Sequence, residues 1–230
     1  MSIEPRLDII GAALADPSRA RILCELMDGR SFTNKELASA ARVTPQTATA
    51  HLQHLSGAGL TTFERSGRHI YHRIANEQVA SALEALAQLS PTDHLTRNPK
   101  TSADTMLARS CYNHLAGRLG VHISTRLIDL DVLTLEGVSL GQGTRYAEFL
   151  ADTGITSPKL SAAQAPAKLC LDWTERRHHL SGPLATAFLT HALDVGWLER
   201  RRGSRALTIT TAGYLGFERF LGLERHRIDA

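Results

Sequence analysis

The feature that most constrains the fold of this chain is the segment 33–74, in which two short helical patterns are followed directly by two strand patterns. Thr33 and Glu36 fit a capping box at the start of the first helix. Ser66-Gly67-Arg68 is a turn signal between two alternating segments, which predicts a β-hairpin. The expected elements are helices 33–41 and 45–55 and strands 60–65 and 69–74. This order predicts a winged helix-turn-helix.

Further helices are expected on both sides of this segment. Apolar residues recur at helical spacing in 7–16 and in 19–27, and Asp16 fits the N-cap of the second of these helices. After the hairpin, Asn76 caps a helix that extends to Leu89. Its apolar stripe is longer than so small a domain can cover. We therefore expect this last helix to form a dimer interface.

The outward face of helix 45–55 carries residue types that read base edges in the major groove of double-stranded DNA. Gln forms two hydrogen bonds with adenine, and Ala packs on thymine methyl groups. The stretch from Arg42 to Arg73 is also basic, with four Arg and one Glu, and clustered cations attract a phosphate backbone. The residues expected to contact DNA are Thr44, Gln46, Thr47, Thr49, Ala50, Gln53, Arg65 and Arg68.

Three strings in this half resemble the ArsR-type (ArsR/SmtB) winged-helix repressors. They are LADPSRARIL at 14–23, the second helix with its glycine-rich exit at 47–60, and GRHIYHRI at 67–74. The resemblance covers about residues 5–90. It implies a homodimer that binds a palindromic operator and is released from it by a small-molecule or metal inducer.

Two familiar metal sites of that family do not carry over to this chain. One uses a Cys-x-Cys pattern at the third helix, but residues 36–43 contain no Cys. The other uses Asp and His pairs on the last helix, but residues 76–89 contain no His and only Glu77 and Glu84 as acids. We therefore expect control to lie in the C-terminal half.

The chain is much longer than the winged-helix motif requires. For 230 residues we expect a DNA-binding domain at 1–90, a polar linker at 91–103, and a sensor, effector or dimerisation domain at 104–230. The net charge of +3 is only weakly basic. Apolar stretches are far shorter than the ~20 residues of a membrane helix, and the N-terminus lacks a signal-peptide pattern. We expect no membrane partner and a cytoplasmic location.

The C-terminal half is expected to be mainly helical, so that the whole chain is mainly α with small β-hairpins (α+β). The expected elements are helices at 106–120, with an extension to 130, at 144–152 and at 184–195, and a short strand at 133–135. A hairpin around Gly203-Ser204-Arg205 follows the last of these helices and repeats the wing pattern of the first half. We interpret this half as a helical domain or as a second, degenerate winged helix.

The inducer hypothesis with the most defined chemistry is a transition-metal ion. Thiolate and imidazole ligands suit zinc-like ions. The metal candidates are Cys111, His114, Cys170 and His178, with Asp172 and His179 nearby. In the alternative interpretation the cysteines are core residues, and Asp172, Glu175, Arg176 and Arg177 form an ion-pair network. The cofactor is accordingly a transition-metal ion or none.

Other hypotheses use the same residues differently. Cys111 and Cys170 suit a thiol sensor, and Tyr112 and Trp173 suit an organic effector. Cys170 with His178 or His179 would give an enzyme a nucleophile and a base. The sequence contains no nucleophile elbow, phosphate loop or HExxH motif, so we expect no enzyme. Three widely spaced cysteines also do not predict a disulfide framework.

Overall fold

The computed structural model of the chain describes residues 5–89, 99–137, 139–161, 164–201 and 203–230. The chain divides into two compact units, an N-terminal unit, Met1–Ala82, and a C-terminal unit, Leu83–Ala230. Among the described residues, no helix is both long enough and apolar enough to cross a membrane.

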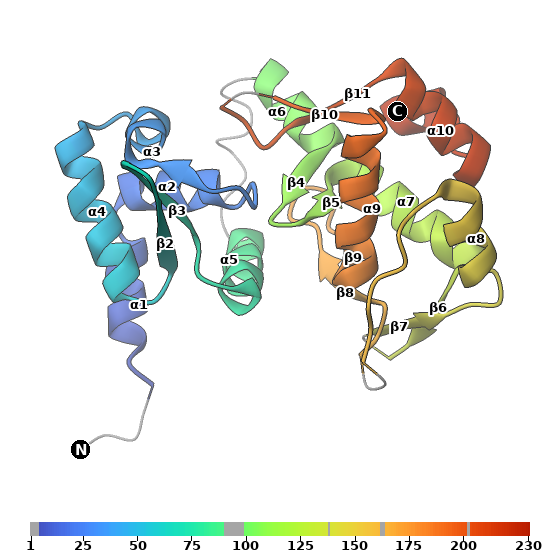
Figure 1. Cartoon of the computed structure of the whole chain (residues 1–230), viewed down its shortest axis with the longest axis horizontal. Coiled ribbons are helices and arrows are strands. Elements are labelled where there is room, and N and C mark those ends of the chain that lie inside the picture. The colour runs from blue at the N-terminus through green and yellow to red at the C-terminus, as the bar shows by residue number, and fades with distance from the viewer. Residues whose placement is uncertain (1–4, 90–98, 138, 162–163, 202) are drawn as a thin grey trace. The chain divides into compact units, whose positions relative to one another are not determined.

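The N-terminal unit is a winged helix-turn-helix, as the sequence predicts (Figure 1). A short strand that the sequence analysis did not predict, β1, pairs with β3 and gives a three-stranded sheet of order β1-β3-β2. The elements are α1 (Leu7–Leu14), α2 (Pro17–Leu26), β1 (Phe32–Thr33), α3 (Asn34–Ala41), α4 (Pro45–Gly57), β2 (Thr61–Ser66), β3 (His69–Ile74) and α5 (Glu77–Leu89). Helix α5 begins in the N-terminal unit and ends in the C-terminal unit.

Local capping explains where α2 and α3 begin. The Asp16 side chain accepts hydrogen bonds from the backbone N–H groups of Ser18 and Arg19 at the start of α2. Thr33 and Glu36 form the predicted capping box of α3. Helices α2, α3 and α4 each bury one apolar face, and the core residues that they supply include Ile22, Leu26, Leu37, Leu52 and Leu55. Ile74 at the end of β3 is also buried.

The C-terminal unit is a mixture of helices and antiparallel sheets. Its sheets are the pair β4-β5, the four-stranded sheet β6-β7-β8-β9 and the pair β10-β11. The elements are α6 (Pro99–Leu107), β4 (Arg109–Cys111), β5 (His114–Ala116), α7 (Gly117–Asp129), β6 (Leu133–Glu136), β7 (Ser139–Gln142), α8 (Tyr146–Thr153), β8 (Ala167–Leu171), β9 (His178–Ser181), α9 (Pro183–Asp194), β10 (Leu198–Arg200), β11 (Leu207–Ile209), α10 (Thr211–Leu221) and α11 (Arg225–Asp229). The chain is therefore α+β, as expected, but the C-terminal half contains several sheets and is not clearly the helical domain that the sequence predicts.

The largest error concerns the predicted helix at 106–120. Helix α6 ends at Leu107, the hairpin β4-β5 follows, and α7 begins only at Gly117. Tyr112 turns this hairpin with a positive φ of 58°, and Gly117 starts α7 with a φ of 82°. An added Cβ on Gly117 would lie 2.6 Å from the Met106 backbone oxygen, so only glycine fits there.

Other predicted elements of this half are present in the structure. The expected strand at 133–135 is β6, the helix at 144–152 is α8, and the helix at 184–195 is α9. The hairpin after α9 is also present as β10-β11. Of the predicted linker at 91–103, residues 91–98 lie outside the described residues, and residues 99–103 belong to α6.

Candidate functional site

Helix α4 presents a polar face away from the core of the N-terminal unit. Ala48, Leu52 and Leu55 are its buried residues. Helical spacing places the predicted base-reading residues on the other side, and every one of them is exposed: Gln46, Thr47, Thr49, Ala50 and Gln53. Direct readout in a major groove requires side chains that are exposed on one face of a helix in this way.

Two of the predicted contact residues also hold α4 in place. The Thr44 hydroxyl accepts a hydrogen bond from the Thr47 backbone N–H at 3.2 Å and so caps the helix. Thr49 Oγ1 donates to the Pro45 carbonyl and accepts from Asn34 Nδ2 at 2.5 Å. Asn34, which the sequence analysis did not single out, thus ties α3 to the exposed face of α4.

The wing supplies positive charge beside this helix. Strands β2 and β3 pair from Thr61 with Ile74 to Ser66 with His69, and Gly67 turns the hairpin with a φ of 57°. Arg65 and Arg68 are both exposed near the turn. A groove of about 440 Å³ lies between α4 and the strands and is lined by Asn34, Thr49, Leu52, Gln53, Ser56, Gly57, Phe63, Ile70 and His72.

Large apolar side chains are exposed on α1 and α5. Leu7 on α1 is 73% exposed, and Leu89 at the end of α5 is 82% exposed. Exposed apolar surface of this kind marks an interaction site when several residues contribute. The exposure of Leu89 is consistent with the apolar stripe that the sequence predicts on the helix ending at this residue, which is α5.

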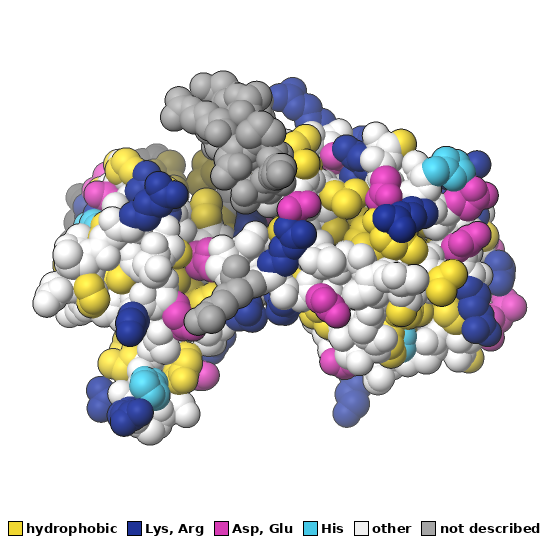
Figure 2. Space-filling view, turned by 90° about the horizontal axis from the view of Figure 1, so that it is seen from above, with side chains coloured by type: hydrophobic (Ala, Val, Ile, Leu, Met, Phe, Trp, Pro, Cys, Tyr) yellow, Lys and Arg dark blue, Asp and Glu magenta, His cyan; other side chains and the backbone are white. Residues whose placement is uncertain are grey.

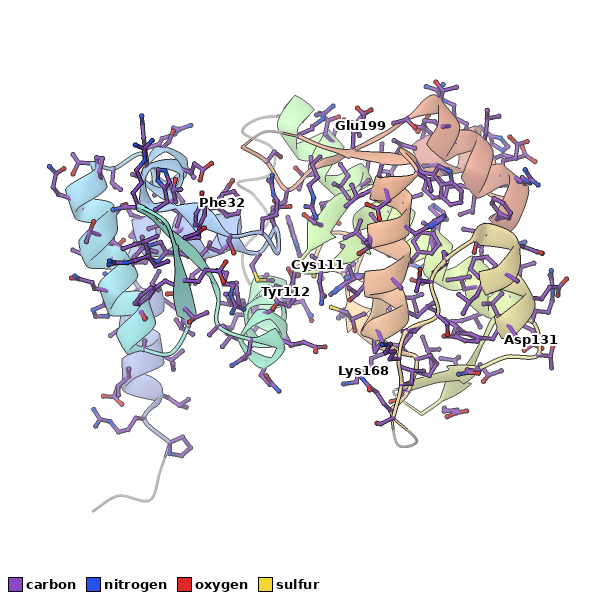
Figure 3. The ribbon with its side chains drawn as sticks, viewed as in Figure 1. Phe32, Cys111, Tyr112, Asp131, Lys168 and Glu199 are labelled. Carbon is purple, nitrogen blue, oxygen red and sulfur yellow. The ribbon has the colours of Figure 1, made fainter. Side chains whose placement is uncertain are left out.

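In the C-terminal unit, two antiparallel strand pairs bring two cysteines and two histidines together. Cys111 faces His114 across the β4-β5 hairpin, and Cys170 faces His179 across β8 and β9. Strand β5 also contacts β9, and Figure 3 shows Cys111 beside Tyr112 at the turn of its hairpin. One ligand atom from each of the four side chains lies within 4.8 Å of all the others. We call this group the Cys/His cluster.

The histidines of the cluster face each other through their Nε2 atoms, which are 3.1 Å apart. Their other ring nitrogens lie near oxygen atoms. Nδ1 of His179 is 3.3 Å from Asp172 Oδ2 as an ion-pair contact, and Nδ1 of His114 is 3.4 Å from Asn113 Oδ1. Cys111 and His179 are fully buried, His114 is buried, and Cys170 is half-buried.

Asp172 is the central acceptor behind the cluster. Its Oδ1 accepts from Arg109 Nη2 at 2.9 Å and from Thr174, and its Oδ2 accepts from the Gly117 backbone N–H at 2.7 Å. Arg109 and Asp172 are both fully buried, and the Arg109 guanidinium stacks 4.6 Å from the centre of the Trp173 ring. Asp172 therefore forms an ion pair with Arg109, a residue that the sequence analysis missed. Among the described residues, no ion pair joins Asp172 to Arg176 or Arg177 of the predicted network.

Electrostatics within the cluster favour a thiolate at Cys170. The neighbouring Cys111 thiol, helped by His114 and His179, lowers the pKa of Cys170 to about 2 against the effect of burial. Burial raises the pKa of Cys111 and lowers the pKa of His114. Burial also opposes protonation of His179, but Asp172 and Cys170 outweigh it and raise the pKa of His179. A thiolate is the form in which cysteine binds metals.

The predicted metal candidates differ from the cluster at one position. Cys111, His114 and Cys170 lie in the Cys/His cluster, whereas His178 is exposed and lies outside it. Its neighbour His179 is the fourth member, because successive residues of a strand point to opposite faces.

On the face of the C-terminal unit seen in Figure 2, basic and acidic side chains are interspersed.

Comparison with known proteins agrees with the fold of the N-terminal unit. Residues 14–62 match a family model described as a helix-turn-helix domain. The HTH-type transcriptional regulator YdfF of Bacillus subtilis (strain 168) is 36% identical over 225 residues, which are 96% of this chain and 100% of that protein. The HTH-type transcriptional regulator CmtR of Mycobacterium bovis is 37% identical over 86 residues, 37% of this chain and 72% of that protein.

Among solved structures, a homodimeric winged helix-turn-helix DNA-binding domain of Mycobacterium bovis, fragment 1–100 of Mb0332, is 33% identical. The match has a TM-score of 0.34 and covers 43% of this chain and 96% of that one. The winged helix and the full-length relative together define an HTH-type transcriptional regulator. The chain belongs to the ArsR/SmtB family of these regulators.

Proposed function

We propose that this regulator is a homodimeric repressor that binds a palindromic operator through α4 and the wing. The observation that carries the proposal is the division of α4 into a buried apolar face and an exposed face with Gln46 and Gln53. Glutamine side chains on a helix that fits the major groove can discriminate bases. Arg65 and Arg68 on the adjacent wing would contact phosphates or the minor groove.

The homodimer would use the exposed apolar residues of α1 and α5. Leu7 and Leu89 are among the most exposed large hydrophobic side chains of the described chain. Burying such a side chain removes its apolar area from water and contributes about 1.5–3 kcal/mol when burial is complete. A twofold dimer also presents two copies of α4, which is what a palindromic site requires.

The C-terminal unit would sense the inducer, and α5 would connect it to the DNA-binding unit. The second half of α5 contacts the surroundings of the Cys/His cluster. Glu84 forms an ion pair with Arg205 at 3.3 Å. Gln88 Nε2 donates a hydrogen bond to the backbone carbonyl of Leu171, the residue after Cys170. A change at the cluster would therefore act on a helix whose first residues belong to the N-terminal unit.

Native mass spectrometry of the full chain with a duplex that it retains from a random pool tests this proposal. We expect complexes with two chains for each duplex. Retention of one chain for each duplex would contradict the homodimeric operator complex, and retention of no duplex would contradict DNA binding.

A further inference from the structure

We infer that the Cys/His cluster is a four-ligand binding site for a divalent metal ion of the zinc class, with Cys111, His114, Cys170 and His179 as ligands. This site lies wholly within the C-terminal unit. The inference does not depend on the proposed operator complex, since metal binding can be measured without DNA.

The spacing of the ligand atoms suits one tetrahedral ion. In such a site, Zn–N distances of about 2.0–2.1 Å place the two nitrogens about 3.3 Å apart. The two Nε2 atoms here are 3.1 Å apart, and all four ligand atoms lie within 4.8 Å of one another. A bound ion would need only small side-chain adjustments.

The backbone gives each ligand pair a rigid support. Cys111 and His114 are directly opposite residues of one hairpin, and Cys170 and His179 are directly opposite residues of the β8-β9 pair. Side chains of directly opposite residues in an antiparallel pair lie on the same face of the sheet. Each strand pair therefore supplies one sulfur and one nitrogen, and the two pairs together supply four ligands.

The oxygen atoms behind the histidines favour the tautomer that binds metal through Nε2. Asp172 Oδ2 lies at Nδ1 of His179, and Asn113 Oδ1 lies at Nδ1 of His114. Holding a proton on Nδ1 leaves the Nε2 lone pair for a metal, and such outer partners are a regular part of histidine metal sites. Each histidine thus has an oxygen atom near Nδ1, although the two belong to different sheets. The Nδ1 of His179 makes no hydrogen bond at its 3.3 Å ion-pair distance from Asp172, so metal binding through Nε2 would require a small turn of this ring toward the carboxylate.

The charges balance when a divalent ion is present. Two thiolates neutralise the ion, and Asp172 is neutralised separately by Arg109. Because thiolate and imidazole ligands suit zinc-like ions, Mg²⁺ and Ca²⁺, which prefer oxygen, are not expected to bind. Four protein ligands also complete a tetrahedral shell, which is typical of a closed rather than a catalytic site.

Cobalt titration of the full chain, purified under reducing conditions and stripped of metal, tests the inference. Co²⁺ replaces Zn²⁺ in tetrahedral sites and gives visible d–d bands together with a near-ultraviolet thiolate-to-cobalt band. We expect both bands to saturate at one Co²⁺ for each chain and to disappear when Zn²⁺ is added. A wild-type chain that takes up no Co²⁺ or Zn²⁺ would overturn the inference.

Matched variants assign the ligands. We expect Cys170→Ser to lose about half of the thiolate-to-cobalt band, because Cys111 remains, and His179→Gln to lose tight binding. Cys24→Ser and His178→Gln should retain the wild-type spectrum, because both residues are exposed outside the cluster. Circular dichroism checks that each variant is folded. An unchanged titration in the folded Cys170→Ser and His179→Gln variants would place the metal elsewhere and overturn the assignment.

A third variant probes the outer partner without removing a ligand. We expect Asp172→Asn to keep one Co²⁺ for each chain and the shape of the spectrum, but to bind about 10–100-fold more weakly. Equal affinity in wild type and Asp172→Asn would overturn the positioning role of Asp172. A disulfide between Cys111 and Cys170 in the chain as first purified, with no metal uptake after reduction, would favour a thiol pair over a metal site.

Discussion

Arg68 at the tip of the wing is expected to contact the DNA backbone rather than particular bases. It is exposed, and its Nε donates to the ring of the adjacent His69 at 3.3 Å. We expect Arg68→Ala to weaken binding to all duplexes and to lower the salt slope of binding by about 1, because one fewer counterion is released. Fluorescence anisotropy at several salt concentrations measures this slope.

Arg219→Ala provides the control for net charge. Arg219 is exposed on α10 of the C-terminal unit, so this variant loses the same charge away from the wing. It should bind duplexes like the wild type. An Arg68→Ala slope equal to that of the control would remove Arg68 from the interface.

Gln46, in contrast, is expected to read bases. It is exposed in the first turn of α4, where base contacts of a recognition helix usually lie. We expect Gln46→Ala to lose about 1–3 kcal/mol of discrimination at one base pair of each half-site, while binding to unrelated duplexes stays the same. Competition between operator variants measures the loss, and Gln142→Ala on β7 is the control. An equal loss of affinity for all duplex sequences would instead indicate that Gln46 contacts the DNA backbone.

At the start of α7, backbone conformation and packing both exclude a side chain at Gly117. Gly117 has a φ of 82°, and an added Cβ would lie 2.6 Å from a backbone oxygen, whereas Gly196 has a φ of 72° with nothing within 4 Å. Each Gly→Ala variant is expected to lose about 1–2 kcal/mol of free energy of unfolding, because alanine must adopt the left-handed backbone conformation. We expect Gly117→Ala to lose about 1–3 kcal/mol more, because its neighbours are backbone atoms.

Tryptophan fluorescence during urea unfolding measures this difference, since both tryptophans of the chain, Trp173 and Trp197, lie in the C-terminal unit. Gly117 also donates its backbone N–H to Asp172. The variant should therefore weaken metal binding as well. Equal unfolding midpoints for Gly117→Ala and Gly196→Ala would contradict the clash.

The elements that the sequence predicts correctly are those with local signals. Thr33 with Glu36 and Asp16 with the following backbone mark helix starts within three residues, and Gly67 marks the wing turn. The hairpin β4-β5 lacks such a signal, because Tyr112 rather than glycine or asparagine adopts the positive φ. The turn between β8 and β9 is similar, with Arg176 at a φ of 51°.

The Cys/His cluster could be predicted only in part, because local sequence signals do not determine which of its residues meet. Residue type alone identifies Cys111, His114 and Cys170 as candidates, but the choice between His178 and His179 depends on which face of β9 is buried. That face is set by the contacts of β9 with β5 and α7, which lie much earlier in the chain. Arg109 reaches Asp172 across 63 positions of sequence, so no local pattern indicates it.

For the whole molecule, the proposal requires a dimer formed through α1 and α5. We expect the Leu7→Glu and Leu89→Glu variants to sediment as monomers and to lose most of their affinity for the operator, because a charge would be buried in an apolar interface. Leu215→Glu is the control, since Leu215 is 63% exposed on α10. Analytical ultracentrifugation measures the mass. Dimers in all three variants would place the interface elsewhere.

The winged helix of this chain is proposed to read a twofold DNA site. Selection of duplexes from a random pool by the full-length protein, followed by sequencing, measures this directly. We expect an enriched inverted repeat with half-site centres about 10 base pairs or a multiple apart, which weakens at defined positions for Gln46→Ala. Enrichment of no sequence, or of a single site without a repeat, would contradict it.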